Sequence, residues 1–363
     1  MKAPHSPEKL PLDGVDWAQL VQPIAEANTA LARYDGLLEA NPNPRLLLSP
    51  LSAQEAVLSS GIEGTVATVE EVFRFEAEAK EKEGRNDAKE VANYRAALLF
   101  AEEELHKRPL CLNLMKSMHS ALLDGVRGRD KGRGEFRRVQ NWITGRTRRL
   151  EDARYVPPEP EKIMYHMSNL EEYCHFEEKD RLVQVAIIHA QFELIHPFVD
   201  GNGRIGRILV PLFLYEKQKL HSPMFYVSAH IDATRQEYYE RLLAISEERD
   251  WTGWMEYFLR IVVAQAQNNS QKAKSIMRLY EKMKQTVSVL TRSSFAIQTL
   301  DFLFNTPVFD STRFTVKANI PKVSASRILN VLEHGRVIIK VEEGRGQKPS
   351  LYIFPELLEI VKV

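Results

Sequence analysis

Cysteine is scarce in this sequence, with only Cys111 and Cys174 among 363 residues. The disulfide framework that holds many small secreted domains together needs more pairs, so the sequence predicts a protein without structural disulfides. The first 14 residues also lack the apolar core of a signal peptide. From these two absences we expect a cytoplasmic protein.

An uninterrupted run of about 18 apolar residues, the length that a membrane-spanning helix needs, is absent as well. Neither charge is in excess, since 49 lysines and arginines balance 49 aspartates and glutamates. These absences argue against a membrane protein, and against a protein that binds nucleic acid or a membrane surface by bulk electrostatic attraction. Any anion binding must therefore be local.

Hydrophobic periodicity organises most of the chain. Apolar residues recur at spacings of three and four, as at Val91, Tyr94 and Leu98, which predicts amphipathic helices. Because 363 residues exceed one typical domain, we expect several structural units. The predicted division is an N-terminal helical region over residues 1–105, a core over 106–265, a connecting helix over 266–290 and a C-terminal domain over 291–363.

Within the core, helical periodicity runs without a break from 161 to 195 and returns over 204–217 and 235–245. The stretch 134–160 departs from it. Val139 and Ile143 lead to a glycine, and the chain resumes with aromatic and branched residues before two prolines. This pattern predicts a β-hairpin.

The C-terminal domain has three predicted helical segments, followed by alternating residues at 337–341 and a second extended segment at 351–353. This order predicts a winged helix-turn-helix. A DNA-binding regulator would use basic and hydroxyl side chains on its recognition helix and wing. The residues at these places are Lys322, Ser324, Ser326, Arg327, Arg345 and Lys348. Acidic and apolar neighbours dilute their charge, so DNA binding through 291–363 stays open beside protein contacts or dimer formation.

The segment 196–207, His-Pro-Phe-Val-Asp-Gly-Asn-Gly-Arg-Ile-Gly-Arg, concentrates residues with chemical potential. Pro197 cannot continue the hydrogen-bond ladder of the preceding helix, so His196 is expected at an ordered helix end. The glycine-rich turn Gly201-Asn202-Gly203 allows positive φ and close approach of backbone to a ligand. The helix that follows points its first N–H groups into this turn, which predicts an anion-binding site.

Three charged residues complete this site. Arg204 and Arg207 are three apart on one helix face, and their planar guanidinium groups suit bidentate contacts to phosphate. Asp200 supplies the hard oxygen that a phosphate-bound Mg²⁺ prefers. The imidazole of His196 ordinarily titrates near neutrality, so it suits acceptance of a proton from an attacking hydroxyl. The segment thus predicts attack on a metal-bound nucleotide phosphate.

With these residues, the segment resembles the signature of the Fic family, ATP-dependent protein adenylyltransferases. The resemblance implies an all-α Fic fold with a small β-hairpin flap, here followed by the winged helix-turn-helix. It assigns His196 as general base, Asp200 as Mg²⁺ ligand, the turn Gly201, Asn202 and Gly203 to the diphosphate, and Arg204 and Arg207 to the β- and γ-phosphates. ATP is then the substrate, and the partner is a protein with a serine, threonine or tyrosine hydroxyl. Phosphorylating relatives carry lysine at the place of Gly203, so AMP transfer is favoured.

The same resemblance extends to two regions around the signature. Thr144 and Gly145 would lie in the flap, which in the family binds the target by β-strand addition. Tyr238 and Tyr239 match the region that closes over adenine, although helix packing is an equal alternative for each. His189 is expected to be buried and hydrogen-bonded, because no third ligand accompanies it and His196 at a metal-site spacing.

Upstream, Ser59-Ser60-Gly61-Ile62-Glu63-Gly64 resembles the inhibitory motif of the family, with Ser59 and Glu63 as its functional residues. A carboxylate that pairs with Arg207 would remove this arginine from the γ-phosphate. The resemblance therefore implies an autoinhibited enzyme. Removal of AMP from the target, self-modification and a homodimer stay open. So do two alternative functions, a winged-helix regulator and a toxin that acts by AMP transfer and is restrained by Glu63.

Overall fold

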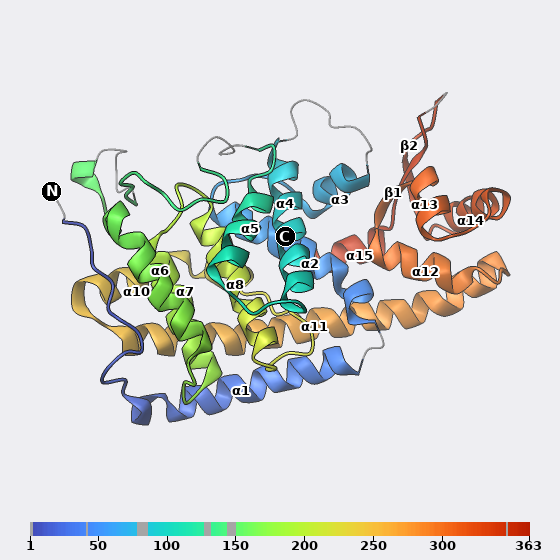
Figure 1. Cartoon of the computed structure of the whole chain (residues 1–363). Coiled ribbons are helices and arrows are strands. Elements are labelled where there is room, and N and C mark those ends of the chain that lie inside the picture. Colours follow the sequence, from blue (N-terminus) through green and yellow to red (C-terminus); the bar gives the residue numbers. More distant parts are fainter. Residues whose placement is uncertain (1–2, 41–42, 78–85, 127–131, 144–149, 346–347) are drawn as a thin grey trace. The chain divides into compact units, whose positions relative to one another are not determined.

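The computed structural model describes residues 3–40, 43–77, 86–126, 132–143, 150–345 and 348–363 (Figure 1). Helices dominate these residues, and the prediction of a mostly helical fold is confirmed. The chain divides into two compact units, one of residues 1–36 and 96–267 and one of residues 37–95 and 268–363. The boundaries predicted from the sequence follow chain order and stay predictions. None of the described helices is both long and apolar enough to cross a membrane.

Three helices contribute residues to both units: α1 (Trp17–Glu39), α4 (Asn86–Leu105) and α11 (Trp251–Thr291). The remaining helical elements of the first unit are α5 (Leu112–Leu122), η1 (Leu150–Asp152), η2 (Pro160–Lys162), α6 (Ile163–His175), α7 (Arg181–Ile195), α8 (Asn202–Glu216), α9 (Ser228–Ala233) and α10 (Arg235–Glu248).

Helix α7 lies at the centre of the first unit. Nearly all of its side chains are buried, in keeping with a sequence that is apolar on every face. Its buried polar side chains are hydrogen-bonded, as burial requires. For example, Gln184 Nε2 donates to the carbonyl oxygens of Tyr173 (2.8 Å) and Phe176 (2.9 Å). Helix α7 therefore gives the residue that follows it, His196, a rigid support.

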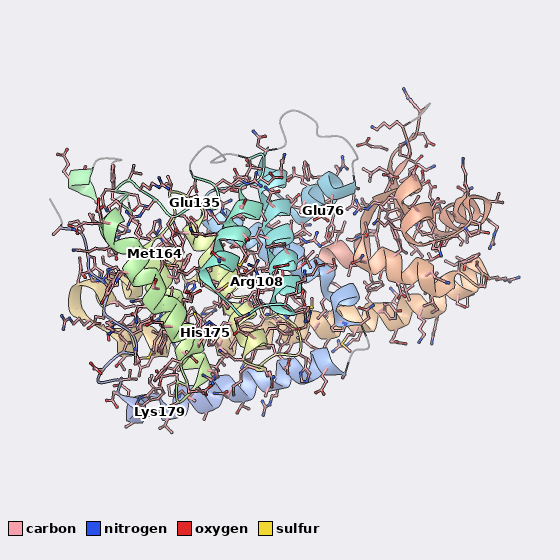
Figure 2. All side chains as sticks on the ribbon, viewed as in Figure 1. Glu76, Arg108, Glu135, Met164, His175 and Lys179 are labelled. Carbon is pink, nitrogen blue, oxygen red and sulfur yellow. The ribbon has the colours of Figure 1, made fainter. Side chains whose placement is uncertain are left out.

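The expectation of uninterrupted helix from 161 to 195 is wrong, because the chain breaks between α6 and α7. Asp180 caps the second helix, and its Oδ1 accepts the N–H groups of Leu182 (2.8 Å) and Val183 (3.0 Å). An aspartate at this position satisfies amides that a new helix leaves unpaired. Lys179, labelled in Figure 2, lies beside the break with its Nζ 5.0 Å from the ring centroid of Trp17.

The extended N-terminal segment, residues 5–10, is held along the first unit by backbone contacts. His5 N–H donates to Val156 O (2.8 Å), and Gln191 Nε2 donates to Glu8 O (2.7 Å). Leu10 exchanges two bonds of 2.8 Å with the Asn169 amide, which donates to Leu10 O and accepts Leu10 N–H. The segment thus links the predicted flap to helices α6 and α7.

The second unit contains α2 (Pro44–Ile62), α3 (Val69–Ala77), α12 (Ala296–Asn305), β1 (Val308–Asp310), α13 (Ser311–Lys317), α14 (Lys322–His334), β2 (Ile339–Glu342), β3 (Leu351–Ile353) and α15 (Pro355–Ile360). Its strands form one antiparallel sheet in the order β1-β3-β2, with Tyr352 opposite both Phe309 and Lys340. The helices and the two later strands follow in the order that the winged-helix prediction requires. Strand β1 was not predicted from the sequence.

Candidate active site

His196 directly follows the last residue of α7. Its backbone is left-handed (φ 49°, ψ 59°), and its N–H donates to Phe192 O as the C-cap of the helix. A left-handed residue other than glycine costs roughly 1 kcal/mol or more, so neighbouring contacts must hold it. The chain therefore turns sharply at His196 and enters the predicted phosphate loop.

Asn202 closes the loop that follows, residues 198–202. Its Oδ1 accepts the N–H of Phe198 and its Nδ2 donates to the carbonyl oxygen of Phe198, both at 2.8 Å. This side chain thus bonds to both the N–H and the carbonyl oxygen of one buried residue. The Nδ2 of Asn141 donates to the same carbonyl oxygen at 3.1 Å. The ring of bonds fixes the loop between His196 and helix α8.

Helix α8 begins at Asn202, two residues earlier than predicted, so Gly203 lies in its first turn. Gly201 is the N-cap, with φ 79°, and it has no side chain that could cap the helix. A Cβ at this position would lie 3.2 Å from Leu122 Cδ2 and 3.6 Å from His119 Cδ2. Both the backbone conformation and the close packing therefore require glycine here.

Arg204 and Arg207 lie on this first part of α8, and both residues are buried (4% and 2% exposed). Arg204 Nη2 lies 3.5 Å from Asp200 Oδ1, which also accepts the N–H of Gly201 at 2.8 Å. Burial strengthens the interaction of guanidinium groups with an anion, because water screens them less. The first two turns of α8 thus combine backbone amides with two buried positive charges.

Asp200 fits the role predicted for a magnesium ligand. Its side chain is 30% exposed, so one carboxylate of the loop stays accessible. Magnesium bound together with a nucleotide needs one or two carboxylates and takes its other ligands from phosphate and water. Among the described residues, no group of three or more histidine, cysteine or acidic side chains could hold a metal. Mg²⁺ binding by Asp200 stays a prediction.

Arg137 holds the backbone of two adjacent residues at the end of α7, His196 and Pro197. Its backbone N–H donates to Pro197 O at 2.8 Å, and its Nε donates to His196 O at 2.9 Å. Its two terminal nitrogens donate to Val139 O (3.1 Å) and Pro158 O (2.5 Å). Burial lowers the pKa of this guanidinium to about 10, which still leaves it charged at neutral pH. The arginine ties the start and end of the 134–160 stretch to His196.

The predicted flap is described only in part. Ile143 and Tyr155 form one antiparallel bridge, with Ile143 N–H donating to Tyr155 O at 2.9 Å. The described residues of this stretch contain no longer β-ladder, and they include the short helix η1. Thr144 and Gly145 lie outside the described residues, so their predicted contacts with a target stay predictions.

His189 is buried and hydrogen-bonded, as predicted. Its Nδ1 lies 2.9 Å from Gly206 O, and its Nε2 lies 2.9 Å from the Tyr238 hydroxyl. A carbonyl oxygen only accepts, so Nδ1 carries the proton and Tyr238 donates to Nε2. Tyr238 is buried by this contact, whereas Tyr239 is half-buried with its ring 6.0 Å from the Arg235 guanidinium. Adenine binding by either tyrosine stays a prediction.

Sequence reasoning missed His119, which lies in α5 and contacts the predicted phosphate loop directly. Its Nε2 is 3.0 Å from Asp200 O, and its Nδ1 accepts the N–H of Gly134 at 2.9 Å. The signal in the sequence was the position of a histidine on an apolar helix face, beside Met115 and Leu122, where a buried imidazole must find hydrogen-bond partners.

The predicted inhibitory motif ends helix α2. Gly64 is left-handed (φ 93°), its N–H donates to Gly61 O at 3.0 Å, and Thr65 N–H donates to Ser60 O at 3.0 Å. These two bonds form a Schellman cap, with Glu63 as the C-cap residue. Ser59 is fully buried in the helix. Glu63 belongs to the second unit and Arg207 to the first, so their pairing stays a prediction.

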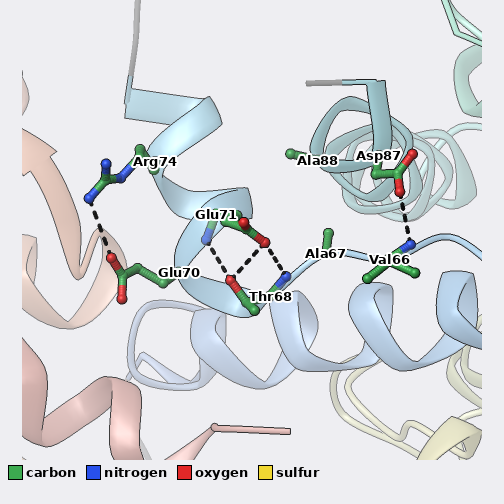
Figure 3. A pocket seen from close by; sticks show the side chains of 8 residues that line it. All are labelled: Val66, Ala67, Thr68, Glu70, Glu71, Arg74, Asp87 and Ala88. Carbon is green, nitrogen blue, oxygen red and sulfur yellow. Dashed lines mark hydrogen bonds and ion pairs between the residues drawn. The ribbon is translucent and has the colours of Figure 1, made fainter. Parts of the chain in front are cut away.

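A cavity of about 530 Å³ follows the motif, between the first residues of α3 and α4 (Figure 3). Thr68 and Glu71 cap α3 reciprocally, with Thr68 N–H donating to Glu71 Oε2 at 2.7 Å. Asp87 Oδ2 accepts the N–H of Val66 at 3.0 Å. These bonds hold the chain that leaves Gly64 against the beginning of α4.

Basic residues of the predicted winged helix make internal contacts. Arg327 Nη1 donates to Thr291 O at 2.9 Å, at the end of α11. Lys348 pairs with Glu342. Both contacts use part of the hydrogen-bonding capacity that a DNA phosphate would need.

Two family models match adjacent parts of the chain. The Fic/DOC family N-terminal model matches residues 21–103, and the Fic/DOC family model matches residues 109–214. The second match contains His196, the phosphate loop and Arg207. Together the two matches span most of the first 214 residues.

Curated relatives match the same region at modest identity. The protein adenylyltransferase Fic of Drosophila grimshawi is 28% identical over 188 residues, which cover 48% of this chain and 35% of the relative. A probable protein adenylyltransferase of Aquifex aeolicus is 28% identical over 193 residues, which cover 52% of this chain and 56% of the relative. The chain thus spans about a third to a half of the length of these relatives.

Solved structures share the fold. A Fic family protein from Desulfovibrio desulfuricans G20 superimposes with a TM-score of 0.58 at 19% identity, covering 98% of this chain and 99% of that one. A Fic domain containing signaling protein from Bacteroides thetaiotaomicron has a TM-score of 0.54 at 18% identity, covering 69% of this chain and 97% of that one. From the family matches, the shared fold and the complete 196–207 segment, we conclude that the chain belongs to the Fic/DOC family.

Proposed function

We propose that this chain is a protein adenylyltransferase, which transfers AMP from ATP to a serine, threonine or tyrosine hydroxyl of a target protein. The observation that carries the proposal is the closed loop 198–202. It joins the helix end at His196 to an N-terminus of α8 that has no side-chain cap and two buried arginines. A general base and a polyphosphate site are thereby held on one rigid segment.

The phosphates of ATP bind at the first turn of α8. Its amide N–H groups and the positive end of the helix attract an anion. Arg204 and Arg207 add charge-assisted hydrogen bonds to the β- and γ-phosphates. Pinning these phosphates leaves the α-phosphate as the reacting group, which supports transfer of AMP over transfer of the γ-phosphate.

In the transfer step, the target hydroxyl oxygen attacks the α-phosphorus. The bond from this phosphorus to the oxygen that bridges to the β-phosphate breaks, and pyrophosphate leaves. His196 takes the hydroxyl proton as the new bond forms. Arg137 keeps the helix end at His196 in place, because it donates hydrogen bonds to the carbonyl oxygens of His196 and Pro197. Asp200 would hold Mg²⁺, which when bound neutralises phosphate charge in the reaction.

We further propose that Glu63 inhibits this reaction by pairing with Arg207, so that the γ-phosphate loses its partner. The Schellman cap at Gly64 supports this role, because it fixes the direction in which the chain presents Glu63. The alternative of a toxin uses the same site and differs only in the consequence for the cell. No contact of the described winged-helix residues favours DNA binding over these two.

The test uses purified wild type, Glu63→Gly, and Glu63→Gly combined with His196→Ala. Each protein is incubated with Mg²⁺, a cell lysate and ATP labelled on the α-phosphate. Labelled protein should appear strongly with Glu63→Gly and disappear with the double variant, since removal of a general base costs about 100-fold or more in rate. A parallel reaction with γ-labelled ATP should stay unlabelled.

Four other outcomes would point elsewhere. Label from γ-labelled ATP alone would indicate phosphotransfer. Equal labelling by wild type and Glu63→Gly would sink the inhibitory role of Glu63 while leaving AMP transfer intact. Silence in every reaction, together with a salt-dependent DNA shift that is lost on deleting residues 291–363, would favour the winged-helix regulator. Growth arrest by Glu63→Gly, but not by the double variant, would identify the toxin.

A further inference from the structure

The buried imidazole of His119 is the strongest unassigned feature near the reaction centre. It lies on α5, 81 residues before the carbonyl group of Asp200 that it contacts. The signature segment contains no residue of α5. We propose that His119 is a positioning residue, which holds the 198–202 loop in the conformation that binds the phosphates of ATP. This inference rests on the proposed function.

The hydrogen bonds of His119 determine its tautomer. Gly134 N–H is a donor, so Nδ1 accepts at 2.9 Å and carries no proton. Asp200 O is an acceptor, so Nε2 carries the proton and donates at 3.0 Å. A neutral imidazole satisfies both groups at once.

The ring also packs against the loop over a wide area. It stacks on the Phe198 ring with 3.8 Å between centroids and 11° between planes. Gly201 approaches the ring so closely that a Cβ would lie 3.7 Å from Nε2. His119 thus contacts the loop at Phe198 and Asp200, and it lies close to Gly201.

The second partner of the imidazole, Gly134, lies three residues before Arg137 in the same segment. Arg137 holds the carbonyl oxygen of His196, while His119 holds that of Asp200. The two side chains therefore fix the two halves of the turn between α7 and α8. Release of the Asp200 carbonyl would let the loop rotate and misdirect both the Asp200 carboxylate and the first amides of α8.

Two substitutions separate the two hydrogen bonds. In His119→Gln, the amide nitrogen replaces Nε2 and keeps a donor for Asp200 O. In His119→Asn, the shorter amide replaces Nδ1, keeps an acceptor for Gly134 N–H and loses the donor. Both are made in the Glu63→Gly background. ATP affinity is measured by calorimetry, and the kcat and KM for ATP are measured with a fixed target.

We expect His119→Asn to lose on the order of tenfold in kcat/KM for ATP, with weaker ATP binding, because one loop bond is missing. His119→Gln should recover most of this loss. Thermal unfolding of both variants should change similarly, since both leave the Phe198 ring without its stacking partner. Equal losses of ATP affinity in the two variants, in step with their unfolding temperatures, would overturn the positioning role.

A direct measurement covers variants that fail to fold. The ¹⁵N chemical shifts of the His119 ring in the unsubstituted protein should show the Nε2–H tautomer, and a proton on Nδ1 would overturn the proposal. The parent protein of these variants, Glu63→Gly, distinguishes a failure of this inference from a failure of the proposed function. A Glu63→Gly protein that binds ATP but transfers no AMP would refute adenylyltransfer and still test His119 through binding. A parent that binds no ATP would overturn both.

Discussion

The Nδ1–H of His189 donates to the carbonyl oxygen of Gly206 across 2.9 Å and so ties α7 to α8 beside the site. The ring is fully buried and stacks parallel to Trp254, with 6.0 Å between centroids. Gly206 allows the close approach of the helices, because a Cβ there would lie 2.3 Å from Glu193 Oε1. Neutral His189 thus links helix α7, which ends before His196, to helix α8, which begins at the predicted phosphate site.

The burial of neutral His189 predicts that the protein loses stability in acid. Burial lowers the pKa of His189 to about 4, and the nearby charge of Arg207 lowers it as well, whereas the unfolded chain titrates at about 6.5. The unfolded state therefore binds the proton more readily, and stability falls as the pH drops from 6.5 towards 4. The loss from this residue is on the order of 3 kcal/mol over that range. Urea unfolding at pH 7 and pH 4 measures it.

His189→Gln is the control for this experiment. The glutamine does not titrate, so its free energy of unfolding should depend less steeply on pH than that of the wild type. Parallel pH profiles for the two proteins would show that other groups cause the acid sensitivity.

Gly201→Ala should weaken ATP binding. The alanine must adopt φ 79°, at a cost of roughly 1–2 kcal/mol, and its Cβ crowds Leu122 at 3.2 Å. Gly36→Ala is the matched control, since Gly36 is helical and a Cβ there meets no atom within 4 Å. The control should gain about 0.5–1 kcal/mol in stability and keep its affinity. Calorimetric ATP binding and thermal unfolding of both variants test the pair.

Gly64→Ala should partly release the inhibition assigned to Glu63. Its left-handed backbone (φ 93°) strains any other residue, so the Schellman cap would open and Glu63 would lose its direction. Basal labelling from α-labelled ATP should rise above that of the wild type. Gly61→Ala, at a helical position with open space around it, should leave labelling low. A rise with Gly61→Ala of the same size would contradict the argument from the cap.

Arg137→Lys should destabilise the first unit by roughly 2–4 kcal/mol, because one ammonium group cannot reach the three carbonyl oxygens of His196, Val139 and Pro158 together. AMP transfer should fall with it, since His196 loses a backbone support. Arg138→Lys is the control, because the side chain of Arg138, the next residue in the chain, is exposed. Chemical unfolding and labelling rates compare the two; equal behaviour would refute the role of Arg137.

The sequence predicted backbone features that depend on neighbouring residues alone. The helix end at His196 follows from Pro197, and the positive φ of Gly201 follows from the glycine turn. The break at Asp180 was missed, although aspartate is a strong N-cap residue, because apolar periodicity continued across it. At Asp180 the preference of aspartate for a helix N-cap outweighed the longer apolar periodicity.

Contacts between distant residues were beyond the reach of sequence patterns. The pairs His119–Asp200 and Arg137–His196 are separated by 81 and 59 positions, and neither residue type at its position has a characteristic spacing to its partner. Each depends on how α5 and the 134–160 stretch pack against the loop. The signature therefore predicted the reacting groups, and the structure adds the side chains that hold them.

The hydrogen bond from His5 to Val156 has a consequence for how a target strand could add to the flap. Neighbouring residues of an extended chain point their backbone groups to opposite edges. Tyr155 bonds to Ile143 at one edge, and Val156 bonds to His5 at the other. The N-terminal segment of the protein already occupies that second edge. An incoming peptide would therefore have to displace this segment, which is anchored through Leu10 and Glu8. Such self-pairing protects a strand edge from indiscriminate partners.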